Sequence, residues 1–449
     1  MKTLIIFIFS AMSSLCAYSQ SWTELGTGSN ALNADSIITT MCVDVSGNIY
    51  AAGKFKDMNG YCYVSKWNGT SWSELGLGNN ALNADSAITS ICADKSGNIY
   101  AAGEFKNAKG KEYVAKWDGT KWSELGAGSN ALNADSAINS ICTDKSGNVY
   151  AAGKFITNGL CYVAKWNGTS WSELGTGSNA LNANIIIARI CCDTSGYIYA
   201  VGNGSNFGMS YAAKWSGSSW NELGTGNNAL NVNFYIYSLC TDLAGNVYAA
   251  GSFYDSSGNF YVSKWNGTKW SELGIGNKAL NANFFILALS TDGSGNVYAG
   301  GLFTSTTDTF YVAKWDGTYW SNLGALNVIQ PISAILTDAE GNVYASGGFK
   351  DVNGKEYIAK YVSASGINNV LPEKGNISIY PNPTNNTFTL KAGLEFIGSE
   401  YYITTQSGKS IMSGKIGNET TSIDISRFAA GIYFVQVGEN RQSFKVVKE

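Results

Sequence analysis

The sequence of 449 residues contains no histidine, and this absence removes several kinds of catalytic and metal-binding site. Serine and cysteine nucleophiles that depend on a histidine base are excluded, and so are metal centres with histidine ligands. Chemistry that uses only carboxylates remains possible. The composition therefore points away from the common hydrolase triads.

Charged residues and prolines are also scarce. Only 14% of the residues are charged, and 30 basic residues against 33 acidic ones give a net charge of −3. A nucleic-acid surface needs clustered Lys and Arg, so we expect no nucleic-acid partner. The 52 glycines, 4 prolines and 13% aromatic residues are instead typical of an all-β protein with Gly-rich turns between short strands.

Long apolar runs are lacking too, and no segment is long enough to span a bilayer as a helix. Residues 1–19 are predicted to be a secretory signal peptide, with Lys2, an apolar run over residues 4–15 and a small-residue cleavage site at 17–19. Cys16 could suggest a lipoprotein. However, Leu15 stands where a lipobox has a small residue, so ordinary cleavage near Gln20 is the favoured prediction.

Eight cysteines follow the predicted cleavage site, and most of them share one position of a repeat. Ser290 and Leu336 fill that position in the last two copies, which indicates a small packing site. We therefore expect mainly free, buried thiols. The cysteines at this position are Cys42, Cys92, Cys142, Cys191 and Cys240, whereas Cys192 falls outside it, and Cys62 and Cys161 share another.

The repeat itself is the most informative feature of the chain. Two strings recur every 49 or 50 residues, apart from one shorter step of 46 residues between the last two aspartates. A fixed period of this size indicates a repeat architecture. Trp-x-x-Leu-Gly begins at Trp22, Trp72, Trp122, Trp171, Trp220, Trp270 and Trp320. Asp-x-x-Gly-x-(Ile/Val)-Tyr-Ala and its close variants begin at Asp44, Asp94, Asp144, Asp193, Asp242, Asp292 and Asp338.

The two strings are offset, and the offset predicts a closed ring. The seventh copy stops at Tyr361 without its Trp-x-x-Leu-Gly ending, while an unpaired ending stands at Trp22. In the copy over residues 72–122, alternating residues predict strands at 87–92, 99–105, 113–117 and 122–125. Asn-Gly and Asp-Gly pairs supply the hairpin turns. We therefore predict a seven-bladed β-propeller over residues 20–361, closed by the N-terminal strand over residues 21–25.

The Asp-x-Ser-Gly-Asn-Ile-Tyr turn resembles the hairpin of NHL-type propellers. The string Tyr-Val-Ala-Lys-Trp-Asn-Gly-Thr-x-Trp-x-x-Leu-Gly resembles kelch-like repeats of secreted proteins, and the two resemblances together cover residues 21–361. They imply an architecture and leave the activity open, because propellers serve many functions.

After residue 361 the period ends. Residues 362–375 are predicted to be a linker, and residues 376–449 a small β-sandwich of short alternating strands. The string Tyr-Pro-Asn-Pro-Thr at 380–384, the strand Ala-Gly-Ile-Tyr-Phe-Val at 430–435 and the terminal Lys-Val-Val-Lys resemble the type A C-terminal sorting domain of the type IX secretion system of Bacteroidota. This resemblance implies recognition by that secretion machinery, passage through the periplasm, cleavage in the linker, and release or attachment to the cell surface.

The repeat aspartates could be read as calcium ligands, because Asp-x-Ser-Gly-Asn is rich in oxygen atoms. The spaced carboxylates and distal Glu of a calcium loop are missing, so we interpret them as turn caps and expect no metal or cofactor. Asn-Gly-Thr is interpreted as a hairpin turn. Asp-Ser-(Ile/Ala) at residues 35, 85 and 135 matches a weak O-glycosylation pattern of Bacteroidota.

One group of loops breaks the repeat symmetry. The joining loops carry Asp35, Asp85 and Asp135 in the early copies, and neutral or aromatic residues in the later ones. Exposed aromatic residues could stack on a sugar or anchor a protein partner, or they could simply plug the mouth of the central channel. The predicted ligand-binding residues are Asn233, Phe234, Tyr235, Asn283, Phe284 and Phe285.

We therefore predict a secreted or cell-surface binding protein without assigned catalytic residues. Two alternatives stay open: a secreted polysaccharide hydrolase or lyase on a propeller scaffold, and a structural surface protein. Catalysis needs acid and base groups that converge at one point, whereas the acidic residues here recur around the ring.

Overall fold

The computed structural model describes residues 21–184, 186–203, 210–230, 232, 234–324, 326, 328, 330–362, 378–393, 396–405, 409–437 and 442–449. The chain forms two compact units, Met1–Ala364 and Ser365–Glu449, and each is described by itself. The predicted signal peptide and nearly all of the predicted linker lie outside the described residues.

The first unit is a propeller of seven four-stranded antiparallel sheets, which we call blades 1 to 7 in the order of their inner strands along the chain. Within each blade, the strands are given from the innermost to the outermost. Blade 1 contains β2 (Ile38–Val43), β3 (Ile49–Gly53), β4 (Ser65–Trp67) and β5 (Trp72–Glu74); blade 2, β6 (Ile88–Ala93), β7 (Ile99–Gly103), β8 (Ala115–Trp117) and β9 (Trp122–Glu124); blade 3, β10 (Ile138–Thr143), β11 (Val149–Gly153), β14 (Ala164–Trp166) and β15 (Trp171–Glu173); blade 4, β16 (Ile186–Cys192), β17 (Ile198–Asn203), β18 (Tyr211–Trp215) and β19 (Trp220–Glu222). Blade 5 contains β20 (Ile236–Thr241), β21 (Val247–Gly251), β22 (Ser263–Trp265) and β23 (Trp270–Glu272); blade 6, β24 (Ile286–Thr291), β25 (Val297–Gly301), β26 (Ala313–Trp315) and β27 (Trp320–Asn322); blade 7, β28 (Ile332–Thr337), β29 (Val343–Gly347), β30 (Ala359–Val362) and β1 (Ser21–Glu24).

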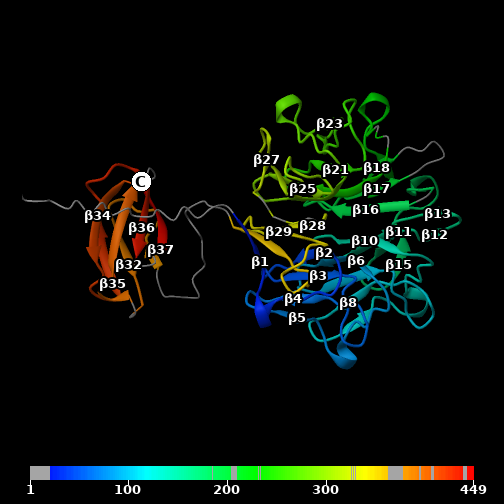
Figure 1. Cartoon of the computed structure of the whole chain (residues 1–449), viewed down its shortest axis with the longest axis horizontal. Helices are drawn as coiled ribbons and strands as arrows, with labels where there is room; N and C mark the ends of the chain where they lie inside the picture. Colours follow the sequence, from blue (N-terminus) through cyan, green and yellow to red (C-terminus); the bar gives the residue numbers. More distant parts are fainter. Residues whose placement is uncertain are drawn as a thin grey trace, which may run out of the picture. The chain divides into compact units, whose positions relative to one another are not determined.

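The blades form a closed ring, as the sequence predicts. Each inner strand lies beside the inner strand of the next blade, and β28 lies beside β2 (Figure 1). The N-terminal strand β1 pairs antiparallel with β30, with Trp22 opposite Tyr361. The first strand of the propeller thus completes its last blade, and the predicted closure is confirmed.

Short elements connect the blades. After six of the seven fourth strands, a single turn of 3-10 helix leads to the next inner strand. Blade 3 has an additional hairpin in the loop between its second and third strands. The helices are η1 (Gly28–Asn30), η2 (Gly78–Asn80), η3 (Gly128–Asn130), η4 (Gly177–Asn179), η5 (Gly226–Asn228) and η6 (Gly276–Lys278), and the hairpin strands are β12 (Ile156–Thr157) and β13 (Leu160–Cys161).

The hydrophobic cores lie between neighbouring blades. The second strands are buried along their length because their alanines and glycine let two sheets approach closely. The cluster that contains Tyr50 and Val64 of blade 1 also contains Ile91 and Ile99 of blade 2. An equivalent cluster joins blade 7 to blade 1. Each blade therefore needs both neighbours to bury its faces, which explains why closure stabilises the whole ring.

The repeat tryptophans link consecutive blades. The indole nitrogen of Trp72 donates to the carbonyl oxygen of Leu25 at 2.7 Å, and Trp122 donates to Leu75 at 2.7 Å. The same bond closes the ring, where Trp22 donates to Leu323 at 3.2 Å. Each Trp-x-x-Leu-Gly string thus supplies a donor toward the preceding blade and an acceptor toward the following one.

The glycine of this string is required by geometry. Gly76 has φ of +90°, and a Cβ atom there would lie 2.5 Å from the carbonyl oxygen of Asn80 and 2.8 Å from the ring of Trp117. Only glycine adopts this conformation without strain and leaves room for the tryptophan.

The repeat aspartates cap the turns between the first two strands of each blade. In blade 1, the carboxylate of Asp44 accepts hydrogen bonds from the backbone N–H groups of Ser46 and Asn48, the Asn48 side chain and the Tyr50 hydroxyl, all at 2.8 to 2.9 Å. Partial burial opposes the charge, but these hydrogen bonds outweigh it and lower the pKa of Asp44. Both carboxylate oxygens are engaged, so the predicted role as turn caps is confirmed.

Side-chain hydroxyl groups form hydrogen bonds with backbone groups of the innermost strands. The innermost strand of a blade has no hydrogen-bonded neighbour on its channel side, which would leave backbone groups without partners. Thr89 donates to the carbonyl oxygen of Ile138 at 2.7 Å, and the N–H of Ile141 donates to Ser90 at 3.0 Å. Side chains of one blade thus complete the edge of the next.

The second unit is a β-sandwich, as the sequence predicts. Its core combines Phe388 and Leu390 from one sheet with Ile403 and Val435 from the other. One sheet contains β31 (Ser378–Tyr380), β32 (Thr387–Lys391) and β35 (Thr420–Asp424), and the other contains β34 (Ser410–Lys415), β33 (Glu400–Thr405), β36 (Gly431–Val437) and β37 (Gln442–Lys448).

Residues near the start of this unit form hydrogen bonds with its C-terminal residues. The N–H of Val447 donates to the side-chain oxygen of Asn382 at 2.8 Å, and the N–H of Thr384 donates to the carbonyl oxygen of Val447 at 2.9 Å. The N–H of Glu449 then donates to Thr384 at 3.0 Å. The Tyr-Pro-Asn-Pro-Thr string and the terminal strand, which carry the resemblance to sorting domains, are therefore in direct contact.

Candidate functional site

One face of the propeller is formed by two sets of loops that lie side by side. The joining loops before each inner strand are bridged to the loops between the second and third strands, as between Ala84 and Cys62 and between Ala282 and Phe260. Polar side chains strengthen this contact. Asp35 accepts from the N–H of Lys56 at 2.8 Å, and Asp85 accepts from the N–H of Lys106 at 2.9 Å. We call this the loop face.

Asn283 replaces aspartate in this structural role. Its side-chain oxygen accepts from the N–H of Thr304 at 2.9 Å, and its side-chain nitrogen donates to the hydroxyl of Thr304 at 3.1 Å. The amide predicted to contact a ligand is therefore already engaged in holding two loops together. Asn233, the equivalent prediction in blade 5, lies outside the described residues.

Aromatic side chains from blades 5 and 6 form a continuous cluster on the loop face. We call it the aromatic arc. Phe284 stacks on Phe285 with ring centroids 4.3 Å apart, and both contact Phe260, at 6.0 and 5.3 Å. Neighbouring rings of the cluster lie 4.3 to 6.4 Å apart. The arc contains Phe234, Tyr235, Tyr237, Tyr254, Phe260, Phe284 and Phe285.

Four members of the arc expose much of their surface to solvent. Tyr235 is 53% exposed, Phe234 46%, Phe284 44% and Tyr254 39%. Phe260 is 9% exposed and forms the base on which its neighbours rest. Side chains that merely plugged the channel by packing would be buried. An exposed, connected aromatic surface is instead a candidate for an interaction site.

The residue at the repeat position of Phe260 differs between blades. The repeat position of Phe260 is occupied by Glu112 in blade 2 and Glu356 in blade 7. Glu112 pairs with Lys106 at 3.7 Å. Burial raises the pKa of Glu356, and the nearby Lys350 opposes this rise. The position is thus charged in blades 2 and 7, is cysteine (Cys62 and Cys161) in blades 1 and 3, and is aromatic (Phe260 and Phe310) in blades 5 and 6.

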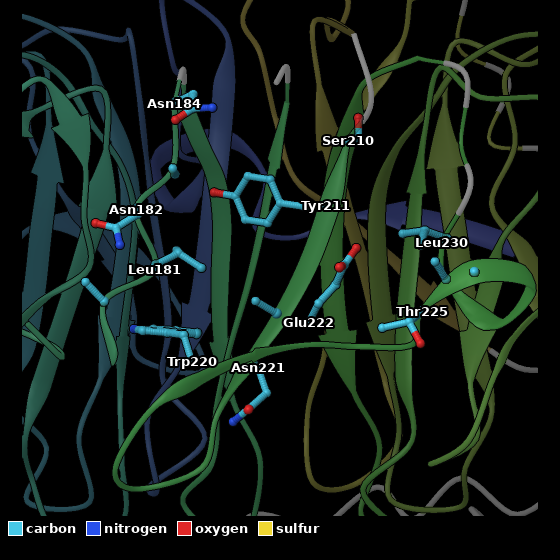
Figure 2. A pocket seen from close by; sticks show the side chains of 15 residues that line it. Leu181, Asn182, Asn184, Ser210, Tyr211, Trp220, Asn221, Glu222, Thr225 and Leu230 are labelled. Carbon is cyan, nitrogen blue, oxygen red and sulfur yellow. The ribbon is translucent and has the colours of Figure 1, made fainter. Parts of the chain in front are cut away.

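A pocket in blade 4 is the second departure from symmetry. It has a volume of about 490 Å³ and lies between the joining loops before and after the blade, with β18 and β19 as its floor (Figure 2). Its walls include Leu181, Asn182, Tyr211, Glu222 and Leu230. At its rim, the hydroxyl of Ser210 donates to the carbonyl oxygen of Phe234 at 2.6 Å, so the pocket borders the arc.

Sequence reasoning located part of this surface and missed the rest. Phe234, Tyr235, Phe284 and Phe285 stood out because they change in aligned loops, and the structure places all four in one cluster. Tyr237, Tyr254 and Phe260 were missed because they lie outside the joining loops that were compared between copies, Tyr237 in β20 and the other two in the loop between β21 and β22. The blade 4 pocket was missed as well, although that copy departs from the repeat consensus between residues 202 and 210.

The fold and the terminal unit together define an exported β-propeller protein. Residues 378–449 match the family described as the secretion system C-terminal sorting domain, which confirms the resemblance noted in the sequence. This domain marks the chain for the type IX secretion system and implies export to the cell surface or secretion. No curated protein sequence matches the chain. Within the described residues, no helix is both long and apolar enough to cross a membrane.

Solved structures confirm the propeller architecture. PorZ, described as a surface component of the type IX secretion system of Porphyromonas gingivalis, is 15% identical, with a TM-score of 0.50 over 92% of this chain and 60% of its own. The extracellular domain of the putative hybrid two-component system BT3049 from B. thetaiotaomicron is 13% identical, with a TM-score of 0.51 over 96% of this chain. The chain spans only 57% of that structure.

A third solved structure is matched over nearly its whole length. Virginiamycin B lyase from Staphylococcus aureus is 12% identical, with a TM-score of 0.53 over 76% of this chain and 99% of its own. At these sequence identities the comparisons show the fold and do not indicate an activity.

Proposed function

We propose that this protein is a surface-exposed or secreted interaction protein that binds a protein partner through the aromatic arc. The observation that carries the proposal is the exposure of four aromatic side chains that belong to one connected cluster on the loop face. Exposed apolar surface of this kind gains free energy when a partner removes it from water. Aromatic residues are also enriched at the energetic centres of protein interfaces.

The chemistry of the arc favours a protein over a glycan as its ligand. A sugar-binding site needs polar groups that read the hydroxyls of the sugar, in addition to a stacking ring. The amide of Asn283 already bonds Thr304 through both its ends. The rings themselves offer only the hydroxyls of three tyrosines. A glycan that stacks on the arc is the second candidate, because tyrosine and phenylalanine rings also fit the apolar faces of sugars.

Binding of the labelled, full-length mature protein to cells of the producing bacterium tests the proposal. Phe234→Ala combined with Phe284→Ala should reduce binding at least tenfold, because interface aromatic residues commonly contribute 2 kcal/mol or more (~30-fold). The matched control is Met58→Ala combined with Val352→Ala. These two side chains are fully exposed on equivalent loops of blades 1 and 7, and no aromatic cluster surrounds them.

Treatment of the cells separates the two candidates. Protease treatment should abolish binding if the partner is a protein, whereas mild periodate oxidation should abolish it if the partner is a glycan. Unchanged binding by the folded Phe234/Phe284 variant would remove the arc as the interaction site.

A further inference from the structure

The sequence of blade 4 lacks the phenylalanine of an aromatic pair that the other six blades form. In each of those blades, a tyrosine near the start of the third strand packs edge-on against a phenylalanine that follows the second strand. In the sequence, Gly204 stands where the others have phenylalanine. The six pairs are Phe55–Tyr63, Phe105–Tyr113, Phe155–Tyr162, Phe253–Tyr261, Phe303–Tyr311 and Phe349–Tyr357, with centroids 4.8 to 5.0 Å apart.

Tyr211, the blade 4 counterpart, takes a different position. The ladder between β17 and β18 extends to the pair Gly202–Tyr211. The tyrosine ring covers this glycine, because a Cβ atom at Gly202 would lie 2.3 Å from the ring and the hydroxyl oxygen. Figure 2 shows the hydroxyl end of Tyr211 directed toward the loop that carries Leu181, Asn182 and Asn184.

The Tyr211 hydroxyl is buried and has no hydrogen-bond partner. Buried polar groups almost always have one, and an isolated orphan calls for an explanation. Burial also raises the pKa of Tyr211, so the hydroxyl keeps its proton and can donate. Tyr211 lines the pocket, and a bound molecule that reaches its hydroxyl would supply the missing partner.

The remaining walls indicate the chemistry of that molecule. The described residues that line the pocket include no lysine or arginine, which argues against an anion, and Glu222, the one carboxylate among them, is solvent-exposed. Amides and hydroxyls dominate the polar surface, among them Asn182, Asn221 and Thr225. Aliphatic side chains such as Leu181 and Leu230 form the apolar surface. This mixture matches a ring that has hydroxyls at its edge and C–H groups on its faces, and the volume falls within the ~300–1,000 Å³ usual for small-molecule sites.

We propose that the blade 4 pocket binds a neutral, polyhydroxylated molecule of the monosaccharide class, with one ligand hydroxyl paired to the Oη atom of Tyr211. This site is separate from the aromatic arc, although Ser210 connects their edges. The protein thus presents a polar pocket for a sugar unit beside an apolar surface for a protein partner.

Titration calorimetry and saturation-transfer NMR on the full mature chain test the proposal, with D-glucose, D-galactose, D-mannose and N-acetyl-D-glucosamine as probes. At least one probe should bind. Tyr211→Phe keeps the ring and removes the hydroxyl, and it should weaken binding about tenfold, as expected for one buried hydrogen bond. Ala229→Trp should abolish binding by filling the pocket, because Ala229 lines it.

Two controls make the result specific. Tyr261→Phe alters the equivalent tyrosine of blade 5, whose ring packs on Phe253, and should leave sugar affinity unchanged. Thermal unfolding should show Tyr211→Phe at least as stable as the parent, because no native hydrogen bond is lost. The proposal is overturned if none of the probes binds, or if Tyr211→Phe binds with parental affinity.

The arc variants distinguish this proposal from the proposed function. The Phe234→Ala/Phe284→Ala protein should retain sugar binding while it loses its surface partner. Loss of sugar binding in that variant, with Tyr211→Phe unaffected, would place the sugar on the arc and refute the pocket.

Discussion

Replacing Trp22 with alanine should weaken the pairing of β1 with β30, where the first strand of the propeller joins the last blade. Trp22 donates to the carbonyl oxygen of Leu323 at 3.2 Å, and its ring lies 5.3 Å from that of Tyr361. The hydrogen bond contributes ~0.5–1.5 kcal/mol and the aromatic pair ~0.5–1.5 kcal/mol. Removal of a large buried aromatic side chain costs ~3–5 kcal/mol in total. Because Trp22 is only partly buried, we expect a loss of about 2–4 kcal/mol in the free energy of unfolding.

Urea unfolding followed by far-UV circular dichroism measures this loss without relying on tryptophan fluorescence, to which 13 tryptophans contribute. Trp122→Ala is the matched control, since its side chain has the same role between blades 1 and 2 and is 8% exposed. It should cost ~3–5 kcal/mol. Only the Trp22 change, or deletion of residues 21–27, should also expose β30 as a free edge and promote association, visible by size-exclusion chromatography. If Trp22→Ala unfolds within about 0.5 kcal/mol of the parent, β1 does not hold the ring together.

Three further predictions follow from the turn caps, the cysteines and the terminal unit. Partial burial opposes ionisation of Asp44, Asp144 and Asp292, but hydrogen bonds outweigh it and lower the pKa values of these carboxyl groups. Their contribution to the free energy of unfolding is therefore present above the unfolded pKa of ~4 and is lost as the pH falls through the folded pKa values. Thermal unfolding at pH 7, 4 and 3 should show this loss of stability, and an unfolding temperature that does not change with pH would contradict it. The Sγ atoms of Cys142 and Cys192 lie 2.9 Å apart, yet burial raises the pKa of the Cys142 thiol and disfavours the reactive thiolate. Thiol counting on unfolded, unreduced protein should therefore find eight free thiols. A count of six that Cys142→Ser restores to the full number expected for that variant would show a disulfide between blades 3 and 4. Deletion of residues 376–449 should retain the propeller in the periplasm, detected by cell fractionation, and unimpaired secretion of the truncated chain would defeat the proposed role of this segment.

The repeat period made the fold readable from the sequence. Strand positions are dictated by alternation and by Asn-Gly and Asp-Gly turns, so the strands expected at 87–92 and 122–125 are found at Ile88–Ala93 and Trp122–Glu124. The unpaired ending at Trp22 was sufficient to predict the closure, because only a ring gives it a partner. The limits of the predicted domains remain predictions, since the segment between the two units is outside the described residues.

The candidate sites were harder to predict, for a physical reason. A repeat sequence shows which residues differ between copies, but not which differing residues touch across loops. Tyr254 and Phe260 belong to the arc only because the loop that carries them bridges to Ala282 in the next joining loop. The shape of the pocket depends on the direction of the Tyr211 ring. In the sequence, glycine stands at the position where the other blades have the phenylalanine partner of this tyrosine. That replacement is visible in the sequence, whereas the direction of the tyrosine ring is not.

The pairing of β1 with β30 has a consequence for the topology of the chain. Trp22 opposite Tyr361 is the counterpart of Trp72 opposite Trp67 in blade 1, where residues 68–71 form the hairpin turn between them. The two ends of the propeller therefore occupy the place of one missing turn. A circular permutant that joins Tyr361 to Trp22 through a copy of the Asn-Gly-Thr-Ser turn, and starts at any of the other six turns, should build the same ring. The turn at which the propeller is interrupted is thus one of seven equivalent positions that the architecture allows.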